Sequence, residues 1–158
     1  MSSWERYKQT MRVTPSLWSA AKANDSIALQ ELLKGADLNV RDTRGYSPLM
    51  LAAYSGSLEA AELLLGAGAD ANTADNSGNS ALMGAAFKGD VFIIDLLIHY
   101  GADVAQRNHV GMTAIDFAVL FGRKAAQEKL RAIPGSLTTN RRLSVIVNVV
   151  KNCFSRAA

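Results

Sequence analysis

The chain repeats itself every 33 residues, and this period constrains its fold more than any other feature. "LAAYSG" at 51–56 returns as "GAAFKG" at 84–89 and as "FAVLFG" at 117–122. In the same phase, "GADAN" at 68–72 returns as "GADVA" at 101–105. A period of this length is typical of proteins that stack one small structural unit several times.

Each unit reads as a pair of helices. Ser47 suits the cap of a first helix, Pro48 suits its first turn, and Gly56 suits the left-handed residue that ends it. The second helix of the same unit carries apolar residues at helical spacing, beginning at Leu58. The pattern predicts helix pairs at 47–55 with 58–66, 80–88 with 91–99, and 113–121 with 124–132.

Small residues recur in the middle of every first helix. The pair Ala52-Ala53 has equivalents in the other copies, namely Ala20-Ala21, Ala85-Ala86 and Ala118-Val119. One helix pair cannot bury its apolar faces alone, so the pairs must stack, and close stacking requires small residues at the contact. The sequence therefore predicts an all-α solenoid.

The stretch "DTRGYSPLMLAAYSGSLEAAELLLGAGADAN" at 42–72 closely resembles the ankyrin repeat. It shares the Gly, Ser/Thr-Pro-Leu, Ala-Ala, Leu-Leu and Gly-Ala-Asp landmarks. Including a shorter first copy that begins with "LWSAAKAND", the resemblance covers about residues 16–133. It divides them into repeats at about 16–41, 42–74, 75–107 and 108–133. It implies stacked helix-turn-helix units with protruding loops or short hairpins, as in small stand-alone ankyrin proteins, including bacterial ones.

One landmark of that family is missing. The histidine that usually follows Pro-Leu, and that helps tie neighbouring loops together, is replaced here by Met50, Met83 and Asp116. This departure puts the rigidity of the loops in question, but not the fold. Asp116 is expected to hydrogen-bond locally, and the recurrent Asp70 and Asp103 are expected to bond within their turns.

The two ends of the chain differ from the repeats. Residues 1–15 are expected to form an N-terminal helical extension (a helix at 2–12 covering the first repeat). The last repeat helix, 124–132, is polar where interior copies are apolar, as a terminal cap requires. Residues 134–158 form a basic extension, whose apolar residues at helical spacing are Leu143, Ile146, Val147, Val150 and Phe154.

The extension is open to several interpretations. "SVIVNVV" is rich in β-branched residues, so a strand is an alternative to the amphipathic helix. Three roles compete: packing on the last repeat as a cap, binding a partner or a second copy, and touching an acidic membrane surface. An oligomer is expected only through this extension.

The residues offer no constellation for catalysis, a cofactor or a metal. The chain has two histidines, His99 and His109, and its single cysteine, Cys153, lies far from both in the sequence. Residues 16–133 carry ten basic and thirteen acidic side chains, and this negative balance argues against nucleic-acid binding. The lone cysteine and the absence of a signal-peptide pattern favour the cytoplasm.

The resemblance implies a protein-binding surface on the concave face and at the loop tips. Positions that vary between copies are free to serve it. Tyr54, Phe87 and Leu120 are expected to form a ladder with Phe121 beside it. The rim of this ladder is expected to consist of Arg41, Arg44, Lys88 and Arg107. The candidate partner-binding residues are Arg41, Arg44, Tyr46, Tyr54, Phe87, Lys88, Arg107, His109, Met112, Leu120 and Phe121.

The leading hypothesis is a non-catalytic adaptor or an inhibitor of the immunity-protein type that holds another protein on this face. Two alternatives remain. One is a membrane-associated scaffold that acts through residues 136–158. The other is an enzyme or small-ligand protein that uses His109 and Asp116.

Overall fold

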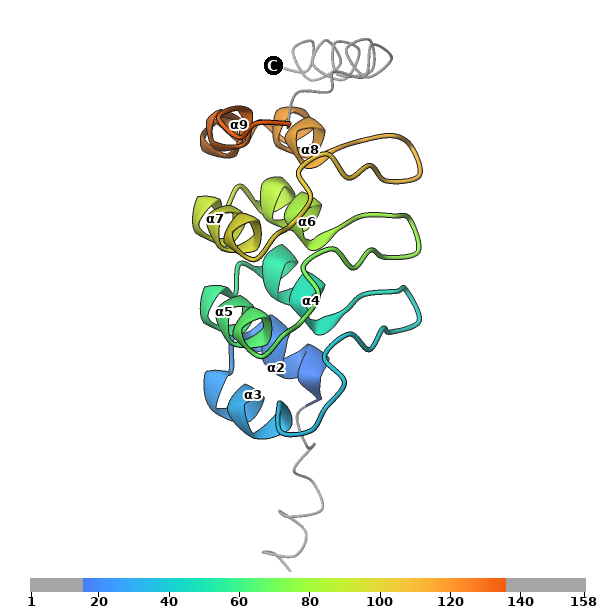
Figure 1. Cartoon of the computed structure of the whole chain (residues 1–158), viewed down its shortest axis with the longest axis vertical. Coiled ribbons are helices and arrows are strands. Elements are labelled where there is room, and N and C mark those ends of the chain that lie inside the picture. The colour runs from blue at the N-terminus through green and yellow to red at the C-terminus, as the bar shows by residue number, and fades with distance from the viewer. Residues whose placement is uncertain (1–15, 136–158) are drawn as a thin grey trace, which may run out of the picture.

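The computed structural model describes residues 16–135, which form eight helices stacked as four pairs in one column (Figure 1). The first helices of the pairs are α2 (Leu17–Ala23), α4 (Pro48–Ser55), α6 (Ala81–Lys88) and α8 (Ala114–Leu120). The second helices are α3 (Ser26–Leu32), α5 (Leu58–Gly66), α7 (Val91–His99) and α9 (Lys124–Arg131). The predicted bounds of α4 to α9 are confirmed to within one residue. The helix expected at 2–12 and the extension at 136–158 lie outside the described residues.

Local chemistry sets where the first helices begin and end. The Ser47 and Ser80 hydroxyls accept hydrogen bonds from the third backbone N–H of α4 and α6, at 3.3 and 3.4 Å. Asp116 accepts from the N–H and the hydroxyl of Thr113, at 2.9 and 2.8 Å, as the expected local bond. Gly56 ends α4 with a φ of 79°, a conformation that favours glycine.

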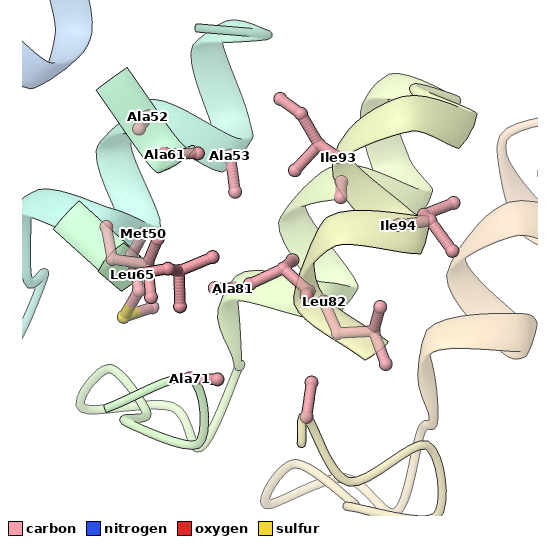
Figure 2. Packing of buried hydrophobic residues seen from close by; sticks show 14 of the residues in the cluster. Met50, Ala52, Ala53, Ala61, Leu65, Ala71, Ala81, Leu82, Ile93 and Ile94 are labelled. Carbon is pink, nitrogen blue, oxygen red and sulfur yellow. The ribbon is translucent and has the colours of Figure 1, made fainter. Parts of the chain in front are cut away.

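The core runs through the column where successive pairs meet. Ala52, Ala53, Ala85 and Ala86 have no exposed surface, and α4 packs against both α2 and α6. Met50 and Met83, which replace the usual histidine, are fully buried. Figure 2 shows such buried side chains from neighbouring pairs gathered between their helices. Small residues at the contact therefore let the first helices approach closely, as predicted.

The loops between units project to one side of the column (Figure 1) and are bonded to one another. The N–H of Asn76 donates to the carbonyl of Arg44 at 3.1 Å, and the N–H of His109 donates to Ser77 at 3.0 Å. At the base of the loops, Asn72 accepts from the N–H of Asp103 at 2.7 Å. Asparagines and backbone groups thus tie the loops together where the usual histidines are missing.

The recurrent aspartates bond within their own turns, as predicted. The Asp70 carboxylate accepts from the N–H of Asn72 at 2.9 Å, and Asp103 accepts from Ala105 at 2.8 Å. These carboxylates shape turns in which the chain reverses toward the next unit.

Candidate functional site

A row of four aromatic rings, Tyr46, Tyr54, Phe87 and Phe121, crosses three neighbouring units; we call it the aromatic row. The Tyr46 and Tyr54 ring centroids are 5.9 Å apart and the rings meet edge to face. The Tyr54 ring lies 6.2 Å from Phe87, and Phe87 meets Phe121 edge to face at 4.6 Å. These separations and angles are those of attractive aromatic pairs. The rings expected to gather on this side of the stack therefore form one continuous row.

Tyr54 also has a packing role within the stack. It is half-buried, and its ring lies directly over Gly84 in the middle of α6. A Cβ added at Gly84 would be only 2.9 Å from Cδ2 and 3.1 Å from Cγ of that ring. Variation between copies led us to expect that the stack does not require Tyr54. The structure corrects this expectation, since its ring fills the room that Gly84 leaves.

The surroundings of Tyr54 disfavour its ionised form. Burial raises the pKa of its hydroxyl well above the ordinary value, and the carboxylate of Asp75 and the nearby Tyr46 raise it further. Asp75 is itself buried and accepts from the N–H groups of Ser77 and Asn79, each at 2.8 Å. Tyr54 therefore keeps its proton to a higher pH than an exposed tyrosine does.

Phe121 forms the end of the row. Leu120 was expected to be the third rung with Phe121 beside it, and Phe121 supplies the ring that meets Phe87. Because α8 ends at Leu120, Phe121 occupies the C-terminal cap position, where α4 and α6 have glycine. Leu120 is half-buried, whereas Phe121 is 43% exposed and is the most accessible ring of the row.

Basic residues of the expected rim lie at two places. Lys88 follows Phe87 directly, and its side chain reaches over the turn of the preceding unit. A Cβ added at Gly56 in that turn would be 3.2 Å from Cε of Lys88. Arg41 and Arg44 are exposed on the first loop. Cations therefore stand both beside the row and on the loop that leads into Tyr46.

The remaining candidates lie on the last loop. Arg107 is exposed and donates to the carbonyl of Gly111 at 2.7 Å. His109 is exposed and its ring sits against Gly78 of the preceding loop, where a Cβ would be 2.8 Å from Cδ2. Met112 is half-buried. These three residues form a loop-tip group in which His109 contributes to loop stacking.

Sequence reasoning missed Arg123. Its Nε donates to the carbonyl of Phe87 at 2.9 Å, and its side-chain carbons lie against Gly89. Arg123, which belongs to the following unit, therefore contacts and stabilises the C-terminal end of α6, where Phe87 and Lys88 lie. The sequence feature that could have indicated this role is a cation at a position where the preceding units have Ser57 and Asp90.

The comparison with known families decides the family. A model of ankyrin repeats, in three copies, matches residues 17–108. The chain belongs to the ankyrin-repeat family. A search of curated proteins found no significant match. Ankyrin repeats generally mediate protein–protein interactions, and the family is typically non-enzymatic.

The ankyrin domain shows little that would support other chemistry. Within residues 16–135, no three His, Cys, Asp or Glu side chains gather as metal ligands would. Over the same residues, no helix combines the length and hydropathy that crossing a bilayer requires. His109 and Asp116 serve loop stacking and helix capping respectively. Both residues of the enzymatic alternative therefore have structural roles in the described part of the chain.

Proposed function

We propose that this ankyrin protein is a non-catalytic adaptor or inhibitor that holds a partner protein against the aromatic row and the neighbouring loop tips. The observation that carries the proposal is the continuity of the row from the first projecting loop to the exposed ring of Phe121. Aromatic and arginine side chains dominate the binding energy of protein interfaces. Here the aromatic row crosses three stacked units, and Arg41 and Arg44 are exposed on the loop that leads into it.

We propose different roles for the rings of the row, according to how far each is buried. Tyr54 is fixed between Tyr46, Phe87 and Gly84, so it supports the row from within. Phe121 offers the largest accessible surface of the row for a partner to cover. Its position beside Phe87 extends the apolar contact along the row.

The charges suggest what the partner presents. Lys88, Arg41 and Arg44 are exposed around the row, and the proposed partner surface is therefore apolar at its centre and acidic at its edge. We also propose a cytoplasmic location, because a chain with a single cysteine suits a reducing compartment. Inhibition would follow from covering a functional surface of the partner.

The test is capture from the native cell with two matched variants. Phe121→Ser removes the exposed ring of the row. Phe92→Ser removes a ring that is 69% exposed on the second helix α7 and is not one of the four rings of the row. We expect the wild type and Phe92→Ser to capture the same stoichiometric protein, and Phe121→Ser to lose it. Equal capture by both variants, or no stoichiometric partner for the wild type, would count against the proposal.

A further inference from the structure

The first helix at the C-terminal end of the stack keeps an apolar side that is incompletely covered. Ile115 and Val119 on α8 are half-buried. The residues at the same positions of α4 and α6 are fully buried, namely Leu49, Leu82, Ala53 and Ala86. In the interior of the stack, α4 is covered by α6 and α6 by α8 (Figure 1). These positions of α8 therefore face the place that a following unit would occupy.

The second helix of the same unit is built differently. The outer residues of α9 are polar, including the exposed Lys124, Glu128 and Arg131, as is expected at the end of a repeat stack. On α8, by contrast, Val119 is larger and more apolar than the alanines it replaces. The terminal unit is thus capped at α9 but not at α8.

We propose that residues 136–158 of the same chain cover this side of α8, in the place of a following first helix. Their apolar residues recur at the spacing of one helix face, namely Leu143, Ile146, Val147, Val150 and Phe154. A face of this kind would bury itself against Ile115 and Val119. The proposal concerns the end of the stack and is independent of the partner site.

The length of the chain fits this placement. Residues 67–80 connect α5 to α6, and residues 100–113 connect α7 to α8. Between the end of α9 at Arg131 and the first apolar residue of the extension, Leu143, lie residues 132–142. The connection is therefore only slightly shorter than those that already place one first helix on the next.

The charges are complementary. Residues 134–158 carry four basic and no acidic side chains, whereas residues 16–133 have an excess of three acidic ones. On α8 itself, the half-buried carboxylate of Asp116 occupies the position of the fully buried Met50 and Met83. A basic segment lying on α8 would place cations near this carboxylate, and the pair would be partly shielded from water.

Cys153 allows a direct test on the full chain, since it is the single cysteine. We would attach a nitroxide to Cys153 in isotope-labelled protein and record the loss of backbone amide signals. The expected result is a several-fold loss for amides of α8 and little loss for α2, at the opposite end of the stack (Figure 1). Equal intensities in α8 and α2 would overturn the proposal.

Two further measurements separate other occupants. In the first, isotope-labelled protein without nitroxide is mixed with unlabelled, nitroxide-bearing protein, so that only contacts between copies reduce the amide signals. A several-fold loss of α8 signals in this mixture would assign the face to a second copy and overturn the proposal. In the second, the full chain is sedimented with phosphatidylserine vesicles. Sedimentation with the vesicles, together with undiminished α8 amide signals in solution, would overturn the proposal in favour of lipid.

A pair of matched substitutions tests the contribution of the extension to stability. Val147→Asp should lower the melting temperature by about 4 °C or more, and the matched Asn148→Asp by about 1 °C or less.

Discussion

The contact between Tyr54 and Gly84 makes an unusual prediction about a helix glycine. Gly84 lies inside α6, where alanine is normally the better helix former by about 0.5–1 kcal/mol. The ring of Tyr54 occupies the space that an alanine Cβ would need. We therefore expect Gly84→Ala to destabilise the protein, although the same change stabilises most helices.

The magnitude follows from the distances. A Cβ at Gly84 would be 2.9, 3.0 and 3.1 Å from three atoms of the ring, and one of them, Cγ, is the atom through which the ring joins its side chain. The ring is held on both sides by Tyr46 and Phe87, so it cannot simply swing away. Overpacking of this kind costs about 1–3 kcal/mol, which exceeds the gain in helix propensity.

A double-mutant cycle isolates the effect. Gly84→Ala is compared in the wild type and in Tyr54→Ala by urea unfolding followed by circular dichroism. In the Tyr54→Ala background, Gly84→Ala should stabilise the protein by about 0.5–1 kcal/mol, because the clash is gone. If Gly84→Ala stabilises both backgrounds equally, the reasoning about this contact is refuted.

Three further perturbations test the stack and its loops. Ala85→Leu should lower the free energy of unfolding by about 1–3 kcal/mol, because it overpacks a fully buried contact; unchanged urea midpoints would contradict this. The raised pKa of Tyr54 means that the folded state keeps a proton that the unfolded chain loses near pH 10, so stability should fall as pH rises above about 10. Tyr54→Phe should flatten this fall in melting temperature between pH 9 and pH 11, with Tyr100→Phe as the control. Asn72→Ala removes the side-chain oxygen that accepts a hydrogen bond from the N–H of Asp103 at 2.7 Å. This change should speed hydrogen exchange of the amides in that loop, and an unchanged exchange rate would argue against the bond.

The column of helix pairs could be predicted from the sequence because its determinants repeat. Ser47 and Gly56 act locally, and each recurs 33 residues later, as Ser80 and Gly89. Pro48 does not recur, but proline prefers the first turn of a helix. The small residues at the contacts recur for the same reason. A periodic pattern therefore reveals both the helix bounds and the need to stack.

The details of the aromatic row could not be predicted in the same way. Whether Tyr54 faces a partner or its own chain depends on Gly84, thirty residues away, which stands where the other copies have Leu51 and Phe117. The contact of Phe121 with Phe87 depends on where α8 ends. A glycine inside one helix, paired with a large residue in the preceding unit, was the signal that could have indicated the contact.

The central claim is that a partner protein covers the aromatic row. Once the partner is captured, hydrogen exchange measured by mass spectrometry on the free and bound ankyrin protein tests this claim most directly. We expect added protection at the C-terminal ends of α6 and α8 and in the loop containing Arg44 and Tyr46, with no change in α5 and α7. Protection confined to α5 and α7, with the row unchanged, would contradict it.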